Sequence, residues 1–147
     1  LPCLTAFIPM LMDTGGNSGS QACVSIIRGI SLNEIEFRDL GRVVWKEIRV
    51  SVLCGVCLAV ACFAKIIVID MLLLKSESVT YLVAFVVCAT MAVTVCLAKI
   101  VGSTLPLLAK KLGFDPAVMA SPIITTIVDF LSLLVYFAFA TAMLGIG

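Results

Sequence analysis

The chain has 147 residues, of which 62% are hydrophobic and 13% charged, and its formal net charge is +1. The mean hydropathy of +1.22 is far above that of an ordinary soluble domain. Near-neutral charge, with basic residues not clustered among aromatic ones, argues against a nucleic-acid-binding function. Several apolar runs approach the roughly 20 residues of a membrane span, and strict two-residue alternation is absent, which argues against a β-barrel. We therefore predict an all-α, polytopic helical membrane protein.

The first predicted span covers residues 1–30 and carries an unusual polar middle. Its small residues include Gly15 and Gly19, a spacing that lets two helices approach closely. Polar side chains recur every four residues, which places them on one face of a helix. We prefer a spanning helix that the glycines can break, and the alternative is a loop between two short helices. The polar stripe consists of Asp13, Asn17, Gln21 and Ser25.

Residues 31–47 interleave charged and apolar side chains. That pattern favours an amphipathic cytoplasmic segment at the membrane interface, with Trp45 at headgroup depth, and the alternative is a solvated loop. The second predicted span, residues 48–69, is rich in small residues. The third covers residues 80–108, and Pro106 is expected to kink or end it.

A turn of charged and small residues separates the third and fourth spans. Gly113 is expected to end the third span in a left-handed cap, with Asp115 as N-cap and Pro116 as first residue of the last span, residues 117–145. Basic residues in segments 28–49 and 110–111 place both in the cytoplasm and the C-terminus outside. Leu1 then lies outside too, so we expect a further span before it and hence four spans here of a five-span protomer.

The seven cysteines all lie in or beside apolar runs. Cys54 and Cys57 form a CxxC pattern inside a predicted span, but no second pair and no histidine accompany it. We interpret the cysteines as small apolar residues rather than as zinc or redox ligands.

The last span contains one deep acid, Asp129. A charged residue there costs roughly 2.5–3.5 kcal/mol on insertion scales and usually faces a cavity or a partner. Pro122 lacks an N–H, so the carbonyl of Val118 is expected to be free. Oxygen ligands suit a hard cation such as Mg²⁺ or Ca²⁺. The alternative is a structural ion pair, with Lys99 as the obvious counter-ion. Polar residues at helical spacing around the acid are Ser121, Pro122, Thr125, Thr126, Ser132 and Tyr136.

Two separated motifs carry a family resemblance. The first is Pro9-(x)5-Gly15-Gly16-Asn17-Ser18-Gly19-Ser20-Gln21-(x)6-Arg28-Gly29. The second is Gly113-Phe114-Asp115-Pro116-Ala117, followed by Pro122-(x)2-Thr125-Thr126-(x)2-Asp129. They resemble the second-helix signature, and the fourth loop and fifth helix, of the MgtE magnesium transporter family. The family's first span and its cytoplasmic domains have no counterpart in this sequence.

The resemblance implies a homodimer with five spans per protomer in the bacterial inner membrane. It implies an Mg²⁺ pore at the dimer axis, lined by the second and fifth helices. It assigns the ion site to Asp129, with Thr125 beside it and Asn17 facing the pore from the other helix. We take as further pore-lining candidates Ser121, Pro122, Thr126, Gly15, Gly16 and Gln21.

The predicted function is therefore a channel-like pathway for hydrated Mg²⁺. One alternative is a proton-coupled secondary cation transporter, in which Asp129 carries a proton. Another is a non-conducting membrane scaffold subunit, in which Asp129 pairs with Lys99. We do not predict an enzyme, because the chain has no histidine, one deep acid and no evident nucleophile–base pair.

Overall fold

The computed structural model describes residues 2–75, 79–119 and 122–145, and they form helices without any strand. The prediction of an all-α protein is confirmed. The principal helices are α1 (Pro2–Thr5), α2 (Ile8–Ser31), α3 (Leu40–Lys65), α4 (Tyr81–Lys111) and α5 (Pro122–Leu144). Three shorter helical segments are η1 (Phe37–Asp39), the π-helix η2 (Ile66–Leu73) and η3 (Pro116–Met119).

Within the described residues, three helical stretches are long and apolar enough to cross a membrane, namely Phe37–Leu73, Tyr81–Lys111 and, apart from residues 120–121, Pro116–Leu144. This supports the prediction of a polytopic membrane protein. The 24-residue α2 is about 36 Å long at 1.5 Å per residue, which is also sufficient for a span. Its polar stripe makes it less apolar than the other three, and it stays the predicted fourth span.

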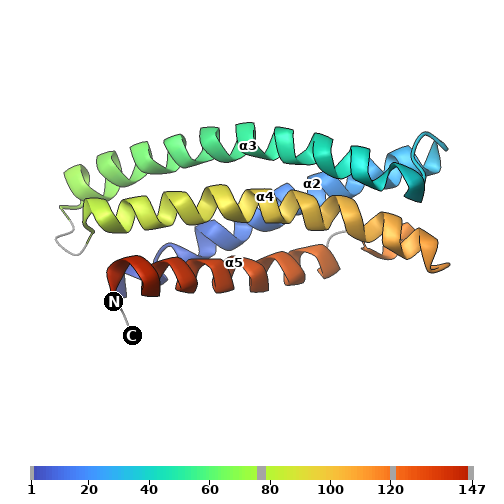
Figure 1. The fold of residues 1–147 in the computed structure, drawn as a ribbon. Coiled ribbons are helices and arrows are strands. Elements are labelled where there is room, and N and C mark those ends of the chain that lie inside the picture. Colours follow the sequence, from blue (N-terminus) through green and yellow to red (C-terminus); the bar gives the residue numbers. More distant parts are fainter. Residues whose placement is uncertain (1, 76–78, 120–121, 146–147) are drawn as a thin grey trace.

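Helix α4 is the centre of the bundle (Figure 1). Helices α3 and α5 lie on either side of it, and α2 crosses it obliquely. Accordingly, α4 contributes more buried residues than any other helix, including Val86, Val87 and Val95, which are fully buried. Large apolar side chains on the outer face of α3, such as Leu53 and Val60, remain exposed, as expected for a surface in contact with lipid.

Helix α2 runs without a break through its glycines, and the interruption that separates it from α1 lies before Ile8. The glycines instead allow α2 and α4 to cross at close range. A Cβ added at Gly102 of α4 would overlap the carbonyl oxygen of Gly19 in α2 and lie 3.1 Å from its Cα. The two backbones therefore meet directly, which only glycine permits at this point.

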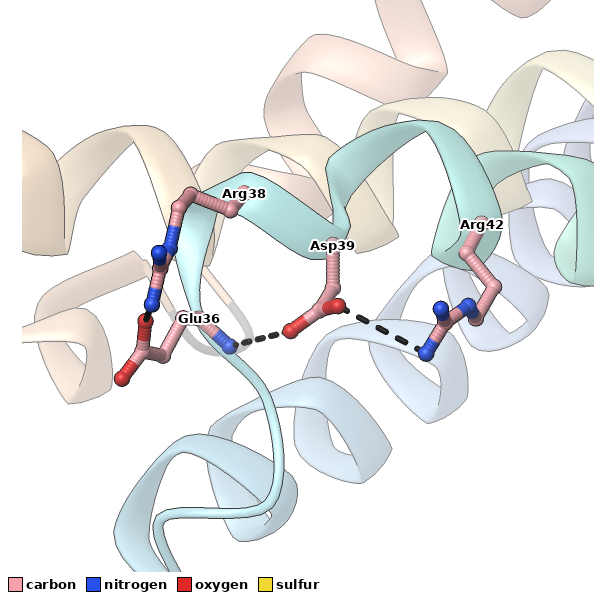
Figure 2. Close-up of polar contacts among 4 residues, drawn as sticks. All are labelled: Glu36, Arg38, Asp39 and Arg42. Atoms are coloured by element: carbon pink, nitrogen blue, oxygen red, sulfur yellow. Dashed lines mark hydrogen bonds and ion pairs between the residues drawn. The ribbon is translucent and has the colours of Figure 1, made fainter.

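The polar stretch before α3 differs from its prediction. Helix α3 begins at Leu40, so the last residues of the predicted interfacial segment belong to the helix that continues into the membrane. The short helix η1 forms the entry to it (Figure 2). The backbone N–H of Glu36 donates to Asp39 Oδ2 at 3.1 Å, and Asp39 Oδ1 lies 3.7 Å from Arg42 Nη1. Arg38 Nη2 pairs with Glu36 Oε2 at 3.0 Å. These surface contacts fix the turn but contribute little individually to stability.

The predicted cap at Gly113 is confirmed. Gly113 has φ +82°, its N–H donates to the carbonyl of Lys110 at 3.1 Å, and the Phe114 N–H donates to that of Ala109 at 2.9 Å. This pair of bonds is a Schellman motif. Pro106 does not end α4, which continues to Lys111.

The predicted start of the last span is confirmed in part. Asp115 Oδ1 accepts a hydrogen bond from the Ala117 N–H at 2.9 Å, so it caps the short helix η3, which begins at Pro116 as predicted. Helix α5 begins at Pro122. Residues 120–121, which join η3 to Pro122, lie outside the described residues, so the expectation of a free Val118 carbonyl stays a prediction.

Tyr136 joins the second half of α5 to the start of the chain by a hydrogen bond. Its hydroxyl is buried and donates to the Leu4 carbonyl at 2.9 Å. That carbonyl also accepts from the Phe7 N–H, so it keeps one partner when the hydroxyl is removed. We expect Tyr136→Phe to lower the free energy of unfolding by about 1 kcal/mol, measured as a lower melting temperature in detergent. Tyr81→Phe is the matched control, because Tyr81 is 70% exposed; an equal loss in both variants would contradict this role.

Candidate cation site between helices α2 and α5

Asp129 and Thr125 lie against α2 at Gly16. A Cβ built on Gly16 would stand 3.7 Å from Asp129 Oδ1 and 3.3 Å from Thr125 Cγ2. Gly16 itself is buried, whereas Asp129 and Thr125 are partly exposed. The absence of a side chain at Gly16 therefore lets a carboxylate and a hydroxyl from α5 come alongside the polar helix. The structure thus brings together residues from both motifs identified in the sequence.

A second acid lies close to this contact. Asp13, one turn before Gly16 on α2, is near enough for its charge to repel that of Asp129. Two carboxylates at membrane depth are unfavourable unless a cation or a hydrated space compensates them. Sequence reasoning placed Asp13 in the α2 stripe but did not associate it with Asp129, because helical spacing says nothing about which face meets another helix.

The α2 stripe opens onto a cavity of about 420 Å³. Asp13, Asn17 and Gln21 all line it, which confirms that this spacing places them on one face, and Asn17 and Gln21 are exposed. The opposite wall comes from α3 and α4. The complete lining is Asp13, Thr14, Asn17, Ser18, Gln21, Cys54, Cys57, Leu58 and Lys99.

The polar residues of α5 divide between two environments. Thr126 and Pro122 are exposed, and the hydroxyls of Thr125 and Thr126 donate to the Pro122 carbonyl at 3.1 and 2.8 Å. Ser132 and Tyr136 are instead buried in the bundle, where Ser132 donates to the Val128 carbonyl at 2.6 Å. Thus the single polar face predicted for α5 contributes only its first turns to the site. Ser121 lies outside the described residues.

Gly15 occupies a different position from Gly16. It is buried between α4 and α5, where an added Cβ would stand 2.7 Å from Thr94 Cγ2 and 3.1 Å from Ser132 Oγ. Within this single chain, Gly15 is therefore a packing residue that holds α2 close to its two neighbours.

The alternative role for Asp129, a structural ion pair with Lys99, is contradicted by the structure. Lys99, its proposed counter-ion, instead faces Glu47 of α3, with Lys99 Nζ 3.8 Å from Glu47 Oε2. Both side chains are about nine-tenths buried. Among residues 2–75, 79–119 and 122–145, no cluster of three or more His, Cys, Asp or Glu side chains is placed to hold a metal ion. The oxygens that this site can offer to a hard cation include those of the Asp129 carboxylate, the Thr125 hydroxyl and the Asn17 amide.

Comparison with known proteins decides the family. The model of the MgtE divalent cation transporter family matches residues 8–139, which is most of the chain. The chain belongs to the MgtE family. This match runs from the start of α2 into α5 and includes every residue of the candidate site.

Three magnesium transporters named MgtE are similar to this chain. That of Bacillus subtilis (strain 168) is 33% identical over 141 residues, covering 96% of this chain and 30% of the relative. That of Thermus thermophilus is also 33% identical over 141 residues, covering 96% and 29%. That of Enterococcus faecalis is 31% identical over 138 residues, covering 94% and 29%. The chain thus spans about 30% of the length of these MgtE relatives, and the resemblance seen in its motifs is confirmed.

Proposed function

We propose that this chain forms the membrane pathway of a divalent cation transporter whose main ion is Mg²⁺. The observation that carries the proposal is the meeting of Asp129 and Thr125 with Gly16 beside the polar stripe of α2. The identity of the ion as Mg²⁺ is inferred from membership of the MgtE family and from its relatives, which are named magnesium transporters. We place the protein in the bacterial inner membrane with its C-terminus outside.

We further propose that two copies associate so that their α2 and α5 faces line one pore. The polar face of α2 and the exposed first turns of α5 lie open in the single chain, as such an arrangement requires. Two Asp129 carboxylates then face one divalent ion, and their two negative charges balance its charge. The charge of Asp13 adds to the attraction for cations on the same face.

The ion passes the site largely hydrated. Mg²⁺ binds its ligands at about 2.0–2.1 Å in octahedral geometry and loses water reluctantly. Six waters at about 30 Å³ each occupy about 180 Å³, so the cavity of about 420 Å³ between α2, α3 and α4 is large enough to hold a hydrated ion next to the α2 stripe. Contact through water makes the width of the pathway part of its selectivity. A membrane potential of 100 mV supplies about 4.6 kcal/mol for two charges.

The test is Mg²⁺ uptake by reconstituted protein in liposomes under an imposed voltage or an imposed pH gradient. A channel-like pathway predicts uptake that rises with inside-negative voltage and does not require a pH gradient. Uptake that requires the pH gradient would instead assign Asp129 the role of a proton carrier. Folded protein that conducts nothing under either condition would contradict the proposal and favour the scaffold alternative.

A further inference from the structure

The buried ion pair between Glu47 and Lys99 has no role in the site described so far. Glu47 comes from α3 and Lys99 from the middle of α4, and their charged atoms are 3.8 Å apart. The exposed fractions of their side chains are 9% and 10%. A buried pair of this kind is weak support for stability, because desolvation offsets most of its attraction. Stability alone therefore does not account for the pair, and a role in function is the alternative.

The position of Lys99 indicates that function. Its side chain lines the same cavity as Asp13, Asn17 and Gln21 of α2. A lone ammonium there would repel cations, and Glu47, held directly beside it, offsets that charge. With both charges present the pair is neutral overall, and Asp13 is the other charged residue that lines the cavity. Glu47 does not itself line the cavity, but it lies directly behind Lys99. Removing either member therefore changes the charge at this wall and immediately behind it by one unit, in opposite directions.

We propose that the Glu47–Lys99 pair sets the electrostatic potential of the α2 cavity and thereby the affinity of the pathway for divalent cations. The part that concerns transport rests on the proposed function. In a site of low dielectric, one unit charge acts on a divalent ion twice as strongly as on a monovalent one. The pair therefore acts as a determinant of cation affinity that lies outside α2 and α5.

The transport experiment measures the KM for Mg²⁺ of reconstituted protein, corrected for the amount of folded protein. Glu47→Gln leaves the Lys99 charge unbalanced and is expected to raise KM about tenfold, whereas Lys99→Met is expected to lower it. The double variant should return towards the wild-type KM. A purely structural pair predicts losses of folded protein in both single variants with an unchanged KM, which would overturn the proposal.

A second lysine–carboxylate pair provides the matched control. Lys65 Nζ lies 2.8 Å from Asp70 Oδ2 at the other end of α3, and neither residue lines the cavity. Asp70→Asn removes one negative charge from the same helical segment as Glu47→Gln does, but at a distance from the cavity. Its KM should equal that of the wild type. A rise equal to that of Glu47→Gln would show a general charge effect and contradict the local role.

Cys57 permits a test that does not depend on transport. It is exposed and lines the cavity. The partly buried Cys3, Cys54 and Cys96 are replaced by alanine, and the buried cysteines stay in place. The ratio of reaction rates with a cationic and an anionic methanethiosulfonate reagent then reports the potential at Cys57. It should fall several-fold in Glu47→Gln and rise in Lys99→Met, with no change in Asp70→Asn.

The two readouts separate the two proposals. Unchanged rate ratios in both cavity variants would overturn the inference, whatever the flux. Shifted ratios in a protein that conducts no Mg²⁺ would sustain the electrostatic role of the pair and reject the proposed function. Shifted ratios together with opposite changes in KM would support both.

Discussion

Asp129→Asn is expected to lower Mg²⁺ flux at least about 100-fold while the protein remains folded. The substitution keeps the size of the side chain and removes its charge, so the packing against Gly16 is preserved. A 100-fold loss corresponds to about 2.8 kcal/mol. One carboxylate about 4 Å from a divalent ion supplies more than that, even at an effective dielectric constant near 20. Flux into liposomes at fixed voltage is the measurement.

Asp115→Asn is the control for this substitution. Asp115 is exposed, lies in the turn before η3, and accepts a hydrogen bond from the Ala117 N–H that an asparagine oxygen can also accept. Its flux should match that of the wild type. Normal flux in Asp129→Asn would place the ion pathway elsewhere in the molecule.

Gly102→Val is expected to have the largest effect on stability. The new side chain would enter the space occupied by the carbonyl of Gly19, and backbone atoms cannot turn aside as a flexible side chain can. Overpacking of this kind typically costs about 1–3 kcal/mol, and we expect about 3 kcal/mol or more here. The loss should appear as a lower melting temperature and less folded protein on size exclusion in detergent.

Gly41→Ala is the opposite case within the same bundle. Gly41 lies in the first turn of α3, and an added Cβ meets nothing within 4 Å. Alanine favours a helix interior over glycine by about 1 kcal/mol, so this variant should be as stable as the wild type or more so. Destabilisation by Gly41→Ala equal to that by Gly102→Val would show that close helix contact is not the cause.

The sequence was informative wherever one helix determines its own structure. Hydropathy predicted helical spans, the four-residue spacing placed Asp13, Asn17 and Gln21 on one face, and Gly113 was recognised as a helix end. The start of α3 was missed because charged side chains on an exposed helical turn have the same pattern as an interfacial segment. At the start of the last span, Asp115 and Pro116 open the helical turn η3 as predicted, and the link from η3 to α5 lies outside the described residues.

Contacts between helices were the part that sequence reasoning could not provide. Asp129 was recognised because it is a single acid in an apolar run, but its neighbours Gly16 and Asp13 belong to another helix. The sequence offers Lys99 only as the obvious counter-ion if Asp129 is structural. The actual partner of Lys99, Glu47, had been placed in the interfacial segment, outside any span. Because the predicted start of α3 lies after Glu47, the sequence does not predict the ion pair between Glu47 and Lys99.

The central claim is that the Asp129 carboxylates of two copies hold one divalent ion between them. Locating the ion in the protein tests this claim most directly. The measurement is a crystal structure of the protein with Mn²⁺ as an anomalous scatterer in place of Mg²⁺. We predict one strong anomalous peak on a two-fold axis, about 4–5 Å from the Asp129 carboxylates of both protomers, as expected for an ion that retains its water shell. Peaks only at the surface loops, or Asp129 side chains turned away from any such axis, would contradict this claim.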